Sequence, residues 1–284
     1  MRKLWSLLFL LVPVGAVYLF WIAPDYQWSL PTNKSSFGEG IDKLYNLILW
    51  ITGVTFVLVN AFLVYFMFRY SAKRENKAAA HVHGNHALEV IWTIVPSLIL
   101  IFIAFVQMKE WQEVKFQSKF PDALQEKAET EAGEKPSLVQ AMARVTARQF
   151  EWRITYPGPD GQYDTVDDIQ TVNELHMPGY KGDEGQEPIP FLIDLESADV
   201  LHSFFVPQFR IKQDAVPGMT IKVWFDAKLD GGPEDDLEFE RLPKNQYDLV
   251  CAELCGWGHY KMKGRVYVHT PEEYQAWLES QGPE

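Results

Sequence analysis

The chain has 284 residues, 47% of them hydrophobic and 23% charged, and its formal net charge at pH 7 is −12. The charge is unevenly distributed, because residues 1–108 carry 8 basic and 5 acidic side chains, whereas residues 109–284 carry 18 and 33. An acidic field of this kind repels nucleic acid, so we expect no nucleic acid partner. The composition predicts an apolar, membrane-associated first part and an acidic second part.

Three segments of the first part contain no charged side chain, namely residues 4–23, 44–68 and 90–108. As helices of 20, 25 and 19 residues, they are long enough to cross a hydrocarbon core of about 30 Å. A buried core helix of a soluble protein is the alternative, but such uninterrupted apolar runs are rare there. We therefore predict a transmembrane helical hairpin over residues 44–108 and a separate apolar helix over residues 1–23.

The N-terminal helix has two interpretations. Arg2 and Lys3 before an apolar run are typical of a secretory signal peptide, although this run is long for one. We interpret residues 1–23 as a transmembrane helix or an uncleaved signal anchor.

The basic residues predict the orientation, because they concentrate on the inner side of membranes. This rule places the N-terminus inside, together with the basic residues that follow the second span, Arg69, Lys73, Arg74 and Lys77. Three spans that begin inside leave residues 109–284 outside. We expect a bacterial inner (plasma) membrane, with this domain on the outer, periplasmic side.

The region between the second and third apolar segments contains His81, His83 and His86. A solvated turn is favoured over a metal site, because no acid or thiol completes a ligand set. Glu89 opens the third segment, where the helix macrodipole favours an acid in the first turn. Pro96 lies inside that segment and predicts a kink.

The second part has the pattern of a β domain. Residues 109–140, rich in Lys, Glu, Ala and Gln, predict a helical or mobile linker. Alternating or β-branched runs separated by Gly, Pro and Asp then predict a β-sandwich or barrel over residues 141–284. These runs are residues 143–156, 191–195, 220–225, 246–251 and 265–269. Thr270 and Glu273 form a capping box that predicts a short final helix.

The acidity of this domain has two explanations, general solubility or attraction of a basic protein partner, and charge alone does not separate them. Four aspartates gather in one Gly- and Pro-containing loop, at Asp160, Asp164, Asp167 and Asp168. The pattern of an EF-hand is not met, so a solvated acidic loop is favoured over a calcium site.

Soft metal ligands cluster near the end of the β domain. Cys251, Cys255, His259 and Met262 are arranged as C-x3-C-x3-H-x2-M, and His202 precedes them in a β-rich segment. Thiolate and thioether ligands select copper, and this combination is typical of electron-transfer sites. A disulfide is the alternative, but it leaves the His and Met without a role. Zinc is not expected to recruit Met, and the spacing differs from the C-x-x-C-H of c-type haem attachment.

These segments resemble the binuclear copper A motif of cytochrome c oxidase subunit II. The resemblance implies that Cys251 and Cys255 bridge two copper ions as thiolates. It implies that His202 and His259 each bind one of the two ions.

Two weaker ligands follow from the same resemblance, Met262 through its sulfur and Glu253 through its backbone carbonyl. In the family this glutamate's carboxylate also reaches a magnesium ion at the boundary with subunit I, whereas a solvated loop acid is the alternative. An apolar shell around the site is expected from Trp257, Phe204 and Phe205, although each is also an ordinary core aromatic.

Residues 88–96 resemble the start of the family's second conventional helix, in which the glutamate matching Glu89 lies at the mouth of a proton path into subunit I. Residues 149–152 read Gln-Phe-Glu-Trp where the family usually has Gln-Trp-Tyr-Trp. Phe150 thus replaces the Trp through which electrons commonly enter. The region of Phe150 and Trp152 is the candidate for electron uptake.

The resemblance implies a membrane-anchored α+β protein, in which two conventional transmembrane helices and the N-terminal helix or anchor precede a cupredoxin-like β-sandwich or barrel. The implied function is that of subunit II of a respiratory haem-copper oxidase, which passes electrons from an outer donor to haem in subunit I for reduction of oxygen to water. Expected partners are subunits I and III, cytochrome c or another small donor protein, and membrane lipid.

No C-x-x-C-H follows the copper motif, so we expect no haem in this chain. Quinol-oxidising relatives lack the copper ligands, which argues against that class. A membrane-anchored cupredoxin carrier or copper-delivery protein remains the alternative function. The paired cysteines and residues 88–96 disfavour it.

Overall fold

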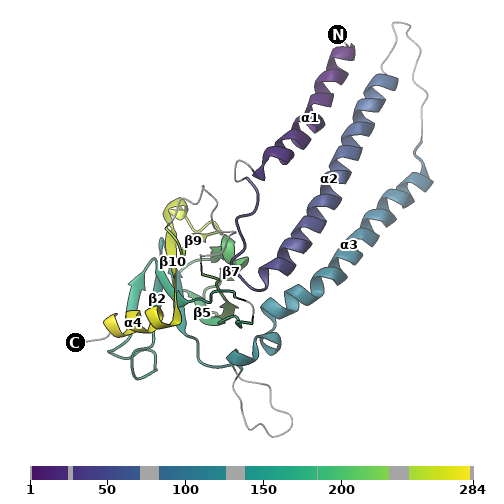
Figure 1. Ribbon diagram of the computed structural model, residues 1–284. Helices are drawn as coiled ribbons and strands as arrows, with labels where there is room; N and C mark the ends of the chain where they lie inside the picture. The colour runs from purple at the N-terminus through teal and green to yellow at the C-terminus, as the bar shows by residue number, and fades with distance from the viewer. Residues whose placement is uncertain are drawn as a thin grey trace, which may run out of the picture. The chain divides into compact units, whose positions relative to one another are not determined.

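The computed structural model describes residues 2–24, 28–70, 83–125, 138–183, 185–229 and 243–281, which belong to two compact units (Figure 1). The first unit comprises Met1–Leu30 and Asp42–Lys109. The second comprises Pro31–Ile41 and Glu110–Glu284. A short segment that ends in the first turn of the second helix therefore belongs to the second unit.

Long helices dominate the first unit: α1 (Arg2–Ile22), α2 (Gly38–Arg69) and α3 (His86–Lys115). By length and composition, α2 and α3 are able to cross a membrane, and their most apolar stretches are only 6% and 0% buried within the structure. The predicted spanning hairpin is thus present as two helices, both longer than expected. The apolar part of α1 within the described residues, Leu7–Ile22, is shorter, and its role as an anchor stays a prediction.

The ends of α3 follow the rules for helix termini. The Asn85 side chain accepts a hydrogen bond from the backbone N–H of Leu88 at 3.3 Å, which satisfies a donor that the helix leaves free. Glu89 lies in the first turn and Lys115 in the last, where each charge complements the helix dipole. Most of the basic residues predicted to follow the second span, and His81, lie outside the described residues.

The second unit is built on two five-stranded sheets. The first has the order β3-β2-β1-β5-β8 and the second the order β4-β10-β9-β6-β7. The strands of the first sheet are β1 (Ala143–Arg148), β2 (Glu151–Tyr156), β3 (Ile169–Val172), β5 (Phe191–Ser197) and β8 (Ile221–Phe225). Those of the second are β4 (Glu174–Pro178), β6 (His202–Val206), β7 (Ile211–Ala215), β9 (Gln246–Cys251) and β10 (Lys263–His269).

Every second side chain of β1 and β9 is buried, as expected when one face of each sheet covers a shared core. Large aromatic side chains fill this core, among them Trp152, Tyr156, Phe191, Phe204 and Phe225. The predicted β-sandwich is confirmed. Residues 143–156 form two strands rather than one, because the chain turns at Gln149 and Phe150 between β1 and β2.

The final helix, α4 (Pro271–Gln281), begins with the predicted capping box. The backbone N–H of Thr270 donates to the Glu273 carboxylate at 2.9 Å, and the Glu273 N–H donates to the Thr270 hydroxyl at 3.2 Å. Within the region predicted as a linker, Phe120 and Leu124 are buried in the core of the second unit. The described part of that region therefore packs against the β domain.

The segment Pro31–Ile41 is fastened to the second unit by contacts that the sequence did not predict. The backbone N–H of Ser36 donates to the Asp226 carboxylate at 2.7 Å, and the Ser36 hydroxyl donates to its other oxygen. Phe37 meets Trp224 edge to face, with ring centroids 5.1 Å apart. Asp226 is fully buried, so Ser36 supplies the hydrogen bonds that a buried carboxylate requires.

We expect the stability of the second unit to depend on pH through Asp226. Burial raises the pKa of this carboxyl above its ordinary 3.8, against the lowering effect of the Ser36 hydrogen bonds and of Lys228. A raised folded-state pKa means that folding takes up a proton, so this contribution is full below 3.8 and is lost as pH rises through the folded pKa. Asp226→Asn should remove that part of the slope, measured as the unfolding midpoint against pH.

Asp164→Asn is the matched control, because the contribution of Asp164 to stability depends on pH in the opposite direction. The hydrogen bond from Arg144 lowers the pKa of the exposed Asp164 carboxyl, so its small contribution is present above 3.8 and is lost as pH falls. If Asp226→Asn leaves the pH slope of the wild type intact, Asp226 is not a group that titrates on folding.

Candidate metal centre

The six predicted ligands come from two strands and one loop. His202 is the first residue of β6, and Cys251 is the last residue of β9. The antiparallel pairing of β6 with β9 places Phe204 opposite Cys251, which brings the start of β6 beside the loop after β9. That loop carries Glu253, Cys255, His259 and Met262 before β10 begins.

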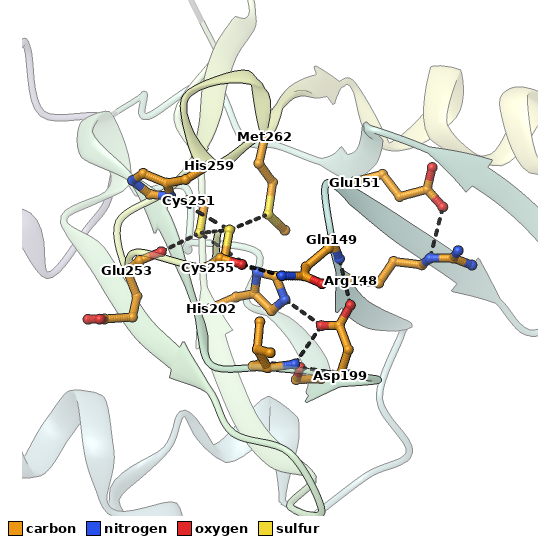
Figure 2. A network of polar contacts seen from close by, with 12 residues as sticks. Arg148, Gln149, Glu151, Asp199, His202, Cys251, Glu253, Cys255, His259 and Met262 are labelled. Atoms are coloured by element: carbon orange, nitrogen blue, oxygen red, sulfur yellow. Dashed lines mark hydrogen bonds and ion pairs between the residues drawn. The ribbon is translucent and has the colours of Figure 1, made fainter. Parts of the chain in front are cut away.

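The structure brings all six residues together (Figure 2). The Cys251 sulfur lies 3.9 Å from His202 Nδ1 and 3.1 Å from the carbonyl oxygen of Glu253. The Cys255 sulfur lies 3.7 Å from His259 Nδ1 and 3.8 Å from the Met262 sulfur. The two cysteine sulfurs are 3.9 Å apart. Each thiol thus faces one imidazole and one weaker donor.

The cysteines are free thiols, since a disulfide requires sulfur atoms about 2.05 Å apart. His202, Cys251 and Cys255 are buried, and their ligand atoms all lie within 4.8 Å of one another. Met262 is also buried, whereas Glu253 and His259 are partly exposed. Two thiols, two imidazoles and a thioether around one small space fit a soft metal such as copper better than a hard cation.

Burial favours the protonated form of the Cys255 thiol when no metal is bound. Burial, followed by the neighbouring Cys251 thiol, raises the pKa of Cys255 to about 11. Only the thiolate binds a metal, so metal binding here releases protons.

A second layer of residues, missed by the sequence analysis, orients the ligands. His202 Nε2 lies 2.8 Å from the Asp199 carboxylate, which leaves Nδ1 toward Cys251. The backbone N–H of Gln149 donates to the same carboxylate at 2.8 Å, and its side-chain amide donates to the Cys255 carbonyl at 2.5 Å. An acid three residues before the histidine was the sequence signal for this contact.

The aromatic residues near the site differ in exposure. Trp152 and Phe204 are fully buried and meet edge to face, with ring centroids 5.7 Å apart. Trp152 also lies edge-on to His202 at 6.4 Å, so Trp152 lines the site and has no surface for a donor. Phe150 is half-buried. The expected place of Trp257 in the apolar shell is wrong, because 81% of it is exposed.

Other candidate sites are less developed in the part of the chain that the structure describes. Glu89 is half exposed, with an oxygen 3.3 Å from His86 Nδ1, and neither His86 nor His83 belongs to a group of metal-binding geometry. The four aspartates of the acidic loop, Asp160, Asp164, Asp167 and Asp168, do not form a group of metal-binding geometry in the described residues either. Their carboxylates bond within the domain, for example Asp164 to Arg144 at 2.8 Å.

Two family models match the chain. The transmembrane domain of cytochrome c oxidase subunit II matches residues 23–109, and the periplasmic domain of the same subunit matches residues 186–267. Together they account for more than half of the chain. The second match contains all six clustered residues.

Two relatives found by sequence comparison are consistent with this match, and one solved structure is also similar. The alternative cytochrome c oxidase subunit 2 of Bradyrhizobium diazoefficiens is 28% identical, over 97% of this chain and 91% of its own length. Cytochrome c oxidase subunit 2 of Synechocystis is 26% identical, over 89% of this chain and 76% of its own length. The crystal structure of the periplasmic domain of subunit II of the Bradyrhizobium japonicum oxidase is 25% identical, over 49% of this chain and 91% of that chain, with a TM-score of 0.36.

The first part of the chain therefore corresponds to the family's membrane domain, and the β-sandwich lies on the outer side of the membrane. The family implies copper A, and the clustered donors fit that group. The family also implies association with further oxidase subunits. The chain belongs to the cytochrome c oxidase subunit II family and serves as a subunit of a respiratory oxidase.

Proposed function

We propose that the clustered donors bind a binuclear copper A centre that takes electrons from an outer donor protein and passes them to haem in subunit I. The observation that carries this proposal is the arrangement of the two unlinked thiols. They lie 3.9 Å apart, and each faces its own imidazole and its own weak donor. Such a set would hold two copper ions better than one, because it offers six donors in two similar halves.

When bound, the copper pair supplies a one-electron acceptor whose charge is shared between two metals. The chain's own residues would keep this acceptor rigid and cover its buried side. Asp199 fixes the His202 ring, Gln149 holds the carbonyl of Cys255, and Trp152 covers the buried side. Ligands that are already in place rearrange little when an electron arrives.

We further propose the finer partners that the family relationship suggests. α2 and α3 would lie in the lipid of a bacterial inner membrane against subunits I and III, and the acidic sandwich would face cytochrome c or a similar small donor. The carboxylate of Glu253 points away from the thiols (Figure 2), while its carbonyl lies toward Cys251. This orientation supports the proposal that Glu253 contributes to a magnesium site at a subunit boundary.

The purified oxidase should contain two copper ions in this chain that share one unpaired electron. Cys251→Ser and Cys255→Ser should each abolish the shared signal, because each removes a bridging sulfur. Met262→Leu should retain both ions with an altered reduction potential, because it removes only a weak ligand. Copper analysis and paramagnetic resonance of the intact complex provide the measurement.

Two outcomes contradict the copper proposal. A single localised copper would favour a cupredoxin carrier, and a disulfide without metal would exclude both functions. A normal two-copper signal in either Cys→Ser variant would show that the bridging roles are wrongly assigned.

Asp199→Ala should weaken copper binding by about 10- to 100-fold, the usual effect of losing a partner of a metal-bound histidine. The copper affinity of Asp199→Asn should lie between those of the wild type and Asp199→Ala, because the amide oxygen still accepts a hydrogen bond from His202. Competition with a copper chelator measures the affinity. Asp248→Ala is the control, since Asp248 lies on β9 but pairs with Arg265 at the surface. Equal affinities for all variants would leave Asp199 without an orienting role.

Glu89→Ala and Glu89→Gln should both slow turnover of the whole oxidase severalfold if Glu89 feeds protons inward, because neither side chain carries an acidic proton. Reduction of the copper centre by the donor should be unchanged in both variants. If Glu89 acts only on the helix dipole, turnover stays normal. Steady-state oxygen consumption and stopped-flow copper reduction separate these results.

A further inference from the structure

Two aromatic side chains meet at the edge of the metal-binding loop. Phe150, in the turn between β1 and β2, lies edge to face with Trp257, with ring centroids 5.2 Å apart. Trp257 lies on the loop between Cys255 and His259 and is 81% exposed, whereas Phe150 is half-buried. The exposed ring at this place is therefore the indole of Trp257.

The glycines on either side of Trp257 explain this arrangement. A Cβ atom at Gly258 would lie 2.5 Å from the Phe150 ring, and one at Gly256 would lie 3.3 Å from it. Gly256 also has a φ of +133°, a backbone conformation that residues other than glycine rarely adopt. The loop backbone therefore rests directly on Phe150. Phe150 supports the loop, and Trp257 is directed outward from that support.

Trp257 is accompanied by other exposed apolar side chains of the same loop. Leu254 is 76% exposed and Tyr260 is 68% exposed. We call Leu254, Trp257 and Tyr260 the loop patch. Large aromatic residues exposed together are typical of a protein contact surface, and Trp and Tyr dominate the binding energy at such surfaces.

We propose that Trp257 is the residue on which the electron donor docks and through which the electron reaches the metal centre. This inference rests on the proposed function. One electron leaves a reduced one-electron carrier, a haem or copper protein, and one electron arrives at the oxidised copper pair. No bond or proton is transferred, and the indole ends in its starting state. The covalent path is short, because a single glycine separates Trp257 from Cys255 on one side and from His259 on the other.

The charge of the second part, taken together with the exposed loop patch, indicates which kind of partner docks here. Residues 109–284 carry 33 acidic and 18 basic side chains, a field that attracts a cationic carrier over distances of about a Debye length. At the loop patch itself the charges are mixed, since Lys261 lies 5.5 Å from the Tyr260 ring and Glu253 lies nearby in the loop. We therefore expect a donor with a basic surface around an apolar edge of its redox group.

The test uses the intact oxidase and a cationic mitochondrial-type cytochrome c as probe. Zinc-substituted probe reports the dissociation constant without electron transfer, and ruthenium-labelled probe reports the rate of electron injection after a flash. The variants are Trp257→Ala and Trp257→Phe. Val166→Ala is the control, because Val166 is fully exposed in the loop after β2, at the opposite end of that strand from Phe150.

Trp257→Ala should raise the dissociation constant about tenfold or more, as for a central interface tryptophan. Trp257→Phe keeps a ring and should bind within about threefold of the wild type. Injection within the complex should slow severalfold in both variants, because the indole is lost. Val166→Ala should change neither quantity, and the two-copper signal should persist in all variants.

Unchanged affinity in Trp257→Ala, or unchanged injection in both variants, overturns the proposal. So does loss of subunit assembly in both variants, which would mean that another subunit covers the loop patch. If only the oxidase with Trp257→Ala fails to assemble, the rate of electron injection in Trp257→Phe tests the proposal: a slower rate supports it, and an unchanged rate overturns it. Absence of the two-copper signal in the wild type would instead refute the proposed function.

Discussion

The metal centre depends on the register in which β6 pairs with β9. Phe204 lies opposite Cys251, so His202, two residues earlier, reaches the loop that follows β9. A shift of one residue would turn His202 to the other face of the sheet. The full burial of Phe204 opposes such a shift, because it would expose that ring to solvent. The packing of Phe204 in the core thus helps to hold His202, which does not belong to the metal-binding loop, in its position.

The turn between β1 and β2 adds the second constraint. Through Gln149 it bonds to Asp199 and to the carbonyl of Cys255, which are 50 and 106 residues away in sequence. Through Phe150 it contacts the two loop glycines. One short turn from the opposite sheet therefore positions both the carboxylate that orients His202 and the backbone that presents Cys255. A loop held at both of these points has little freedom to rearrange on a change of charge.

The sequence predicted the features that local spacing encodes. Cys251 to Met262 lie within one short stretch, and strand alternation and the capping box at Thr270 are likewise local patterns. It did not predict the role of Asp199, the attachment of Pro31–Ile41 or the exposure of Trp257. Each of these depends on contact between distant segments. The sequence of a tryptophan between two glycines does not reveal whether its indole is buried or exposed. Here Phe150 occupies the space beneath the loop, so the indole of Trp257 is exposed.

The two imidazoles consequently lie in different surroundings. His202 is fully buried, bonded to Asp199 and edge-on to Trp152, so its side of the site is closed by the sheets. His259 is partly exposed and lies two residues from Trp257. Among the described residues, the metal centre is therefore open to a partner only along the rim of its own loop. A protein that covers this rim would also remove water from the exposed ligand, and removal of water strengthens the electrostatic interactions of a charged site. Docking and the electrostatic properties of the centre are thus coupled through the same few loop residues.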